Sequence, residues 1–244
     1  MKNNEDIKIA ICFFGLTRSL KYTLSSIQTN VLNILSKNNI AYHIYLHTYN
    51  LEYLTNERSG EYNVKLNINE WKLLKPDFYK ITNQDDFDKT IEIKNYLKCG
   101  DPWHEQKKGS PSVWNLLRQL NSLQIVYKMI NKNYKCFLYL RPDLKYVNKL
   151  NINEVLDIIE NSEQKIIYTP KWGRNLGLNE RCYMGTKKSM DIVCNRINYI
   201  KEYSRKNKPH AERFMKNVIN TNKIINKDFK LIGHRIRANG IVKK

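Results

Sequence analysis

The stretch IKIAICFFG, residues 7–15, decides the fold class of this chain. It is an apolar run of strand length that ends in glycine. The residues after it carry apolar side chains at the spacing of a helix with one buried face: Leu20, Leu24, Ile27, Val31 and Leu35. Another stretch, CFLYL at 136–140, is apolar throughout, as is typical of a parallel strand covered on both faces. Strands that alternate with helices predict an α/β fold, with a mostly parallel sheet flanked by helices.

The rest of the chain continues this alternation. Further strands are predicted at 42–49, 78–81, 166–169, 182–185 and 229–236. Further helices are predicted at 69–74, from 85 or 86 to 97, and at 111–130, 152–160, 188–203 and 211–220. Ser110 is expected to cap the helix that begins at Pro111, and the segment around 56–60 is interpreted as a polar connection.

The composition bounds the function classes. The 244 residues include 42 Lys and Arg against 23 Asp and Glu, a formal net charge of +19. Residues 101–244 hold 29 of the basic and 12 of the acidic side chains, which favours an anionic partner such as nucleic acid, an acidic membrane surface or a phosphorylated small molecule. A Lys-rich solvated surface is the alternative.

No apolar run approaches the roughly 20 residues of a membrane span, and MKNNED at 1–6 shows no secretory signal. The five cysteines form no CxxC or zinc spacing. A cytoplasmic protein is therefore expected.

Parallel sheets bind ligands beyond the carboxyl ends of their strands, so polar residues at strand ends form the candidate site. After the first strand come Gly15, Thr17 and Arg18, where glycine admits a close backbone approach and arginine can pair with a phosphate. The second strand ends in His47 and Thr48. An ordinary turn and a structural histidine are the alternatives at these two places.

The helix after Pro111 carries a stripe of Trp114, Arg118 and Asn121 at positions i, i+4 and i+7. An aromatic ring, a guanidinium and an amide in line can receive a nucleotide or a sugar. The half-buried flank of any helix can have the same spacing.

The segment RPD at 141–143 directly follows the apolar strand at 136–140. Charged side chains at that place are costly unless they face a cleft or are paired. Proline is expected to hold the backbone extended, so that Arg141 and Asp143 project from the sheet edge at a fixed separation. Asp143 is then placed to bind Mg²⁺ or Mn²⁺. A structural Arg–Asp pair is the alternative, and we favour the functional interpretation.

The loop from Trp172 to Arg181 has a composition suited to carbohydrate. Trp172 offers a face on which a sugar ring can stack, and Asn179 and Arg181 offer planar groups for its hydroxyls. Gly173 and Gly177 are expected to let the loop close over the sugar and the acceptor.

Glu180 and Glu212 are the carboxylates considered for general-base catalysis. Glu212 is predicted in the first turn of a helix, where interaction with the helix dipole is the alternative. The sequence contains no GxxxxGK[ST], GxSxG or GxGxxG, which excludes the motifs of P-loop, α/β-hydrolase and dinucleotide-binding proteins.

Several of these segments, taken in order, resemble one family. They are FGLTR at 14–18, HTYN at 47–50, YLRPDL at 139–144, GLNERCYMG at 177–185, HAERFM at 210–215 and RIRANG at 235–240. Together they resemble glycosyltransferases of large DNA viruses and bacterial polysaccharide clusters, which have a GT-A-like, Rossmann-like fold. The resemblance implies a single domain over 1–244, with a nucleoside-diphosphate-sugar bound by about 1–145 and a glycan or glycoprotein acceptor bound by about 146–244.

The sequence departs from this family at one place. GT-A enzymes usually carry Asp-x-Asp where this chain has RPD at 141–143. Either Asp143 holds a Mn²⁺ or Mg²⁺ ion alone, or Arg141 neutralises the diphosphate and no metal is required.

The sequence therefore predicts a glycosyltransferase. Its donor would contact Gly15, Thr17, Arg18, His47, Thr48, Arg118, Asn121, Arg141 and Asp143. Its acceptor would contact Trp172, Asn179 and Arg181, with Glu180 or Glu212 as base if the enzyme inverts. The rival prediction is a basic nucleic-acid-binding protein without catalytic activity, for which no recognisable motif is present.

Overall fold

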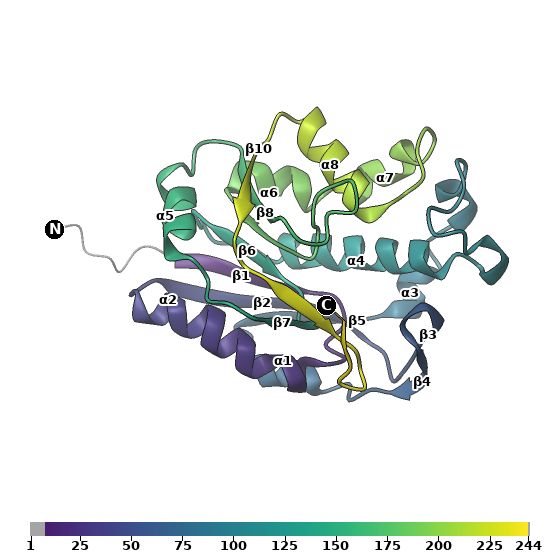
Figure 1. Ribbon diagram of the computed structural model, residues 1–244, viewed down its shortest axis with the longest axis horizontal. Helices are drawn as coiled ribbons and strands as arrows, with labels where there is room; N and C mark the ends of the chain where they lie inside the picture. The colour runs from purple at the N-terminus through teal and green to yellow at the C-terminus, as the bar shows by residue number, and fades with distance from the viewer. Residues whose placement is uncertain (1–7, 244) are drawn as a thin grey trace.

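A seven-stranded sheet forms the centre of the molecule in the computed structural model, which describes residues 8–243 (Figure 1). Its strand order is β10-β8-β9-β6-β1-β2-β5. The strands are β1 (Lys8–Phe14), β2 (Ala41–Asn50), β5 (Phe78–Asn83), β6 (Phe137–Leu140), β8 (Ile166–Pro170), β9 (Cys182–Gly185) and β10 (Ile225–Phe229). Neighbouring strands are parallel except at β9, which runs antiparallel to β6 and β8. The predicted α/β fold with a mostly parallel sheet is confirmed.

Helices cover both faces of this sheet (Figure 1). One face packs against α1 (Leu20–Ile27), α2 (Asn33–Lys37) and α5 (Ile152–Glu160), with a π-helical turn at Gln28–Leu32 between the first two. The other face packs against α4 (Pro111–Lys128), α6 (Lys187–Val193) and α8 (Ala211–Thr221), while α7 (Ile197–Tyr203) lies against α4.

The central strand β1 explains the continuous apolar run. Successive side chains of a strand point to opposite faces. Ile9, Ile11 and Phe13 belong to the core on the α1 side, and Ala10 and Cys12 belong to the core on the α4 side. All five are fully buried, so neither face of β1 tolerates a polar residue.

Two smaller sheets lie beside the main one. A hairpin is formed by β3 (Tyr53–Asn56) and β4 (Glu61–Lys65). The other small sheet has the order β12-β11-β7, from β7 (Leu144–Tyr146), β11 (Gly233–Ile236) and β12 (Val242–Lys243). Because β7 follows directly after β6, its pairing with β11 brings the C-terminal hairpin, residues 233–243, to the carboxyl end of β6.

Several predicted elements differ from the structure. The segment interpreted as a polar connection contributes to the β3–β4 hairpin, whose turn is completed by Gly60 at φ +68°. The helix predicted up to residue 97 ends early: α3 covers Gln84–Asp88, and a 3-10 turn follows at Ile93–Tyr96. The apolar residues between 87 and 97 therefore do not form one face of a helix. Each packs separately against the core between α4 and α7.

Three further boundaries are corrected. The helix predicted at 188–203 is two helices, α6 and α7, because the buried Arg196 side chain turns back to donate to the Val193 carbonyl at 2.8 Å. The strand predicted at 229–236 is split between β10 and β11, in different sheets. Ser110 adopts φ +54° and makes no side-chain capping bond to α4.

Residues 1–6, which were inspected for a secretory signal, lie outside the described residues. So does Ile7, the first residue of the strand predicted at 7–14. Within 8–243, no helix combines the length and the apolar character required to cross a membrane.

Candidate functional site

The carboxyl ends of β1, β6 and β8 meet at one edge of the sheet. The antiparallel strand β9 begins at this edge, so the residues just before it, Glu180 and Arg181, lie there as well. A cavity of about 330 Å³ opens here between the β8–β9 loop and the C-terminal hairpin. Its lining includes Trp172, Arg181, Arg235 and Arg237. The candidate site is therefore built from segments far apart in the sequence.

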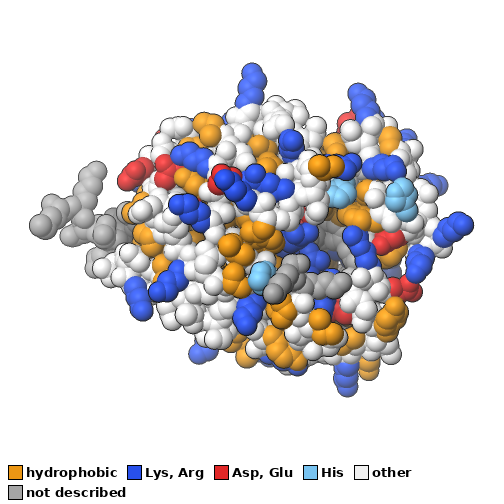
Figure 2. Space-filling view, viewed as in Figure 1, with side chains coloured by type: hydrophobic (Ala, Val, Ile, Leu, Met, Phe, Trp, Pro, Cys, Tyr) orange, Lys and Arg blue, Asp and Glu red, His pale blue; other side chains and the backbone are white. Residues whose placement is uncertain are grey.

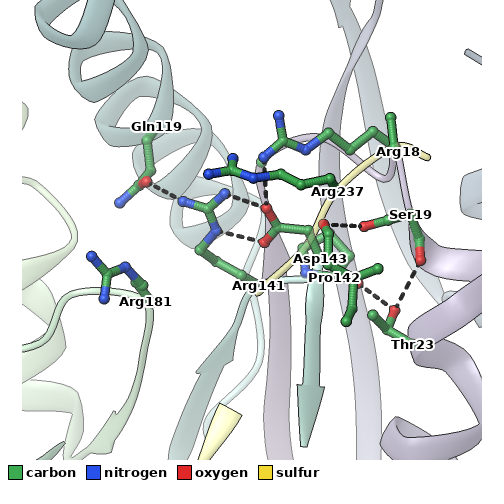
Figure 3. Close-up of polar contacts among 12 residues, drawn as sticks. Arg18, Ser19, Thr23, Gln119, Arg141, Pro142, Asp143, Arg181 and Arg237 are labelled. Carbon is green, nitrogen blue, oxygen red and sulfur yellow. Dashed lines mark hydrogen bonds and ion pairs between the residues drawn. The ribbon is translucent and has the colours of Figure 1, made fainter. Parts of the chain in front are cut away.

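Asp143 is held between two guanidinium groups (Figure 3). Arg141 donates from Nε and Nη2 to its two carboxylate oxygens at 2.8 and 2.7 Å, and Arg18 donates from Nη2 at 3.2 Å. Only 1% of Asp143 is exposed. Burial alone would raise the pKa of this carboxyl, but Arg141 and Arg18 together outweigh it and hold the pKa well below its usual range.

This geometry corrects the expectation for the RPD segment. Residues 141–144 form a turn in which the Leu144 N–H donates to the Arg141 carbonyl at 3.3 Å. The two side chains consequently face each other instead of projecting side by side from the sheet. The paired arrangement considered as the alternative is the one present.

The residues around Asp143 do not fit a divalent metal ion. Mg²⁺ and Mn²⁺ bind through several oxygen ligands, among them one or two carboxylates whose oxygens face the ion. Both oxygens of Asp143 already accept from guanidinium groups, which would repel a cation. Among residues 8–243, no three His, Cys, Asp or Glu side chains are grouped so that they could hold a metal ion.

Glu61 ties the β3–β4 hairpin and the C-terminal hairpin to this cluster. It is fully buried and accepts from Arg18 Nη1 at 3.2 Å and from the Ala238 N–H at 2.9 Å. Arg237 Nη1 lies 3.7 Å from the same carboxylate. Glu61 was not among the predicted site residues, because it adjoins the segment interpreted as a polar connection.

Gln119, on α4, joins the two sides of the site (Figure 3). Its Oε1 accepts from Arg141 Nη1 at 2.6 Å, and its Nε2 donates to Glu180 Oε2. The helical stripe chosen from the sequence passes one residue away, through Arg118. The apolar pattern of α4 marks its core face but does not show which polar flank meets β6.

Glu212 anchors Arg181 from the first turn of α8. Its Oε1 accepts from Arg181 Nη2 at 2.8 Å and from Asn175 Nδ2 at 3.0 Å, and His210 Nδ1 lies 3.3 Å from Oε2. Glu212 is 3% exposed and Glu180 is 4% exposed. The two candidate bases thus lie on either side of Arg181, whose Nε is 3.9 Å from Glu180 Oε1.

The β8–β9 loop is docked in the structure and is not an open flap. Trp172 donates from its indole N–H to the Leu231 carbonyl at 2.9 Å and lines the cavity. Asn179 is fully buried: it donates to the Trp172 carbonyl and accepts from the Arg181 N–H. The Asn179 side chain therefore holds the loop together through hydrogen bonds within it. It was expected from the sequence to contact the glycan acceptor instead.

His47 and Thr48 are also placed differently from the expectation. His47 is fully buried, and its ring nitrogens lie 2.7 Å from Ser122 Oγ and 3.0 Å from Thr82 Oγ1. Burial, and to a lesser extent Lys80, lowers the His47 pKa to about 3. Thr48 is 2% exposed. His47 acts as the structural histidine considered as the alternative.

The same hydroxyl network positions the turn after β1. Ser122 Oγ accepts from the Gly15 N–H at 2.8 Å, and Gly15 has φ +94°, a conformation that favours glycine. Thr17 follows, 7% exposed, and its carbonyl accepts from the Leu20 N–H at the start of α1. This turn places Arg18 within hydrogen-bond distance of Asp143.

Arg118 and Asn121 are not brought to the arginines around Asp143. Arg118 donates from Nε and Nη2 to the two oxygens of Asp88 at 2.9 and 2.6 Å. Asn121 donates to Tyr49 Oη at 2.8 Å. The stripe on α4 therefore binds α3 and β2, which is the ordinary flank considered as the alternative.

The result is an arginine cluster, defined as Arg18, Arg141, Arg181, Arg235 and Arg237. Figure 2 shows basic side chains at and around a hollow near the middle of one face of the molecule. Arg235 and Arg237 were missed as individual candidates, although they lie in the RIRANG segment. The one sequence signal for them is their i, i+2 spacing, which places both side chains on the same side of an extended segment.

No protein-family profile matches the sequence, and no curated protein matches it. Among solved structures, the chain is similar to the apo form of the glycosyltransferase GlyE of Streptococcus pneumoniae TIGR4, with a TM-score of 0.46 and 10% identity. That match covers 91% of this chain and 45% of the GlyE chain, so this chain spans less than half of its length. Mouse xyloside xylosyltransferase 1, also an apo form, has a TM-score of 0.44 and 11% identity, over 91% of this chain and 84% of that one.

Proposed function

We propose that the chain is a glycosyltransferase that moves a sugar from a nucleoside-diphosphate-sugar to an acceptor hydroxyl of a glycan or glycoprotein. One observation carries the proposal. At the ligand-binding edge of the sheet, a cavity lined by Arg181, Arg235, Arg237 and an indole ring adjoins a hydrogen-bonded network that contains Glu180 and Glu212. Cations, an aromatic surface and a carboxylate are the groups that this transfer needs.

The guanidinium groups would act on the leaving group. As the bond between sugar and diphosphate breaks, negative charge grows on the diphosphate oxygens. Fixed cations directed at those oxygens stabilise that charge more in the transition state than in the bound donor. Arg18 and Arg141 are held in place by Asp143, so their orientation is set before the donor binds.

Glu180 is the base that we propose for an inverting reaction. Gln119 donates to Oε2, and the approach of Arg181 to Oε1 is 3.9 Å, so Oε1 retains capacity to accept a proton from an acceptor hydroxyl. Glu212 has both oxygens within contact of Arg181, Asn175 or His210. We assign Glu212 the positioning of Arg181. A retaining reaction would need no such base.

The remaining residue roles are proposed from the position of each residue relative to the cavity. Trp172 would stack on the sugar ring, and the turn from Gly15 to Arg18 would lie beside the nucleotide. The division into a donor half, about 1–145, and an acceptor half, about 146–244, is kept as a proposal with one change. Arg181, Arg235 and Arg237 come from the second half and serve the donor.

The first experiment is a melting screen with UDP, GDP, CMP and dTDP, followed by the corresponding sugar nucleotides in a transfer assay. A nucleotide at about 100 times its Kd should stabilise the fold by roughly 2.7 kcal/mol, which is visible as a raised Tm. Glu180→Gln should keep nucleotide binding and lose roughly a hundredfold or more in transfer rate. The exposed Glu163→Gln, which removes a surface carboxylate paired with Lys188, is the matched control.

Two outcomes would contradict these assignments. If no nucleotide raises Tm while duplex DNA or RNA does, the nucleic-acid-binding rival holds instead. If Glu180→Gln transfers sugar normally while a folded Glu212→Gln is inactive, the base is Glu212.

A further inference from the structure

Arg235 is the member of the arginine cluster with the most unused hydrogen-bonding capacity. Arg18, Arg141 and Arg181 each donate to a carboxylate at 3.2 Å or less. The Arg235 guanidinium lines the cavity, and it makes no hydrogen bond or ion pair with any side chain that the structure describes. A guanidinium group has five N–H donors, so Arg235 offers a complete fork to a ligand.

Arg237 is nearly as free. It is 6% exposed, its Nε has no partner within the described part of the chain, and its one ion pair, with Glu61, spans 3.7 Å. A buried N–H without a partner carries a desolvation cost that an incoming acceptor removes. Both arginines line the same cavity as Arg181.

The neighbouring charges make this cavity unfavourable without an anion. Burial is the largest effect that lowers the Arg235 pKa, and the guanidinium groups of Arg141, Arg181 and Arg237 lower it further against the opposing effect of Asp143. Burial and Arg18 likewise lower the pKa of Arg237. Arginine stays protonated at neutral pH, so these shifts express first the cost of burying the charges and then the repulsion among them. A multivalent anion between them would offset it.

We propose that Arg235 and Arg237 of the C-terminal hairpin, with Arg181, bind the diphosphate of the donor directly and take the place of a divalent cation. This rests on the proposed function and deepens it. A diphosphate presents several oxygens on two adjacent phosphorus atoms. Arg235 in β11 and Arg237 just after it are alternate residues, so their two guanidinium groups can each bind one phosphate group. Among residues 8–243 no three His, Cys, Asp or Glu side chains are grouped so that they could hold a metal ion, which agrees with a site in which arginine supplies the positive charge.

Backbone contacts hold the hairpin that carries these arginines. The Ile236 N–H donates to the Asp143 carbonyl at 2.9 Å, and the Ile236 carbonyl accepts from Ser19 Oγ at 3.0 Å. These contacts fix the backbone on which Arg235 and Arg237 are mounted. The backbone attachment of the two arginines is therefore fixed before any ligand arrives, while their guanidinium groups keep free donors.

The experiment measures the Kd of the nucleoside diphosphate that the screen identifies, by calorimetry on the full chain, in EDTA and again with Mn²⁺. We expect the two Kd values to agree within roughly threefold. We expect Arg235→Gln and Arg237→Gln each to weaken binding by roughly tenfold or more in EDTA, since each removes charged hydrogen bonds. Arg205→Gln, which removes an exposed arginine paired with Glu202 on α7, is the charge-matched control and should bind as the unmodified chain does.

Inorganic pyrophosphate gives a readout that requires no variant. It should compete with the nucleotide in EDTA, so the proposal stays testable even if an arginine variant fails to fold. Nucleotide binding that appears only with Mn²⁺, or that survives both substitutions in EDTA, would overturn the arginine site while leaving the glycosyltransferase proposal intact. Failure of every nucleotide and of pyrophosphate to bind under both conditions would overturn both.

Discussion

At the scale of single residues, Asp143 shows how one buried carboxylate orients arginines from two distant segments of the chain. Its carboxylate accepts from Arg141 and Arg18 and is almost fully buried. Arg18 also pairs with Glu61, so two carboxylates balance Arg18 and Arg141. Asp143 fixes the direction of these two arginines, and Arg235 and Arg237 supply the further positive charge beside the cavity.

We expect Asp143→Asn to lower the free energy of unfolding by about 3–5 kcal/mol, because it leaves the Arg141 guanidinium without its charged partner and Arg18 with Glu61 alone. Denaturant unfolding measures this loss. Asp228→Asn is the matched control: Asp228 pairs with Lys171 and Arg174 but is about half exposed, so a change of about 0–1 kcal/mol is expected. Equal stability of the two variants would show that the buried pair contributes nothing to the fold.

The contribution of Asp143 should also depend on pH. Its pKa in the folded chain is lower than in the unfolded chain, so the unfolded chain takes up the proton first as the pH falls. The stabilisation is present above about pH 4 and is lost progressively below it. Asp143→Asn should therefore flatten the fall in stability below about pH 4.

At the scale of elements, the β8–β9 loop and the start of α8 form one unit. The Leu178 N–H donates to the Glu212 carbonyl at 2.9 Å, and Glu212 in turn binds Arg181. Gly177 allows this approach, because a Cβ atom there would overlap the backbone of Glu212 and Arg213. Its role is close packing, and not the loop freedom expected from the sequence.

Gly177→Ala should therefore separate the loop from α8. We expect a loss of about 1–3 kcal/mol in the free energy of unfolding from overpacking, together with weaker nucleotide binding as Arg181 moves. Gly109→Ala is the comparison: its added Cβ meets no atom, and its cost of about 1–2 kcal/mol comes only from the left-handed backbone at φ +75°. If Gly177→Ala leaves both stability and binding unchanged, the loop is not held against α8 in solution.

At the scale of the whole molecule, the C-terminal hairpin completes the site. The hairpin pairs with β7 and contacts Ser19 and Glu61, so residues near both ends of the chain meet around Asp143. The general excess of basic side chains is a separate property. Many of these lysines are exposed, and they attract any polyanion without selecting one.

We expect duplex DNA to bind this surface weakly, with an affinity that falls steeply as salt rises, because such binding depends on counterion release. Nucleoside diphosphate binding in the cavity should persist at a salt concentration that removes the DNA. Parallel titrations at low and high salt measure both. DNA binding that resists salt and is displaced by the nucleotide would place nucleic acid in the arginine site and favour the rival function.

Six of the seven strands of the central sheet, its main helices and the strand ends at which the site lies could be predicted from the sequence. Apolar runs such as that of β1, and helical spacing such as that of α1, are local signals, because burial of one face or both faces repeats with the period of the element. For the same reason the segments at 15–18, 141–143 and 172–181 could be identified as neighbours of one sheet edge.

The side chains that form the candidate site could not be predicted from the sequence, because they meet through tertiary contacts. Arg18 and Asp143 are 125 residues apart in the sequence, and Glu61 and Ala238 are 177 apart. No local period carries information about such pairs. Arg118 binds Asp88 and His47 contacts Ser122, whereas Gln119 binds Arg141 and Arg235 lines the cavity. Hydrogen bonds act over about 3 Å, so the path of the chain and the direction of each side chain select the partners among many polar residues of the same kind.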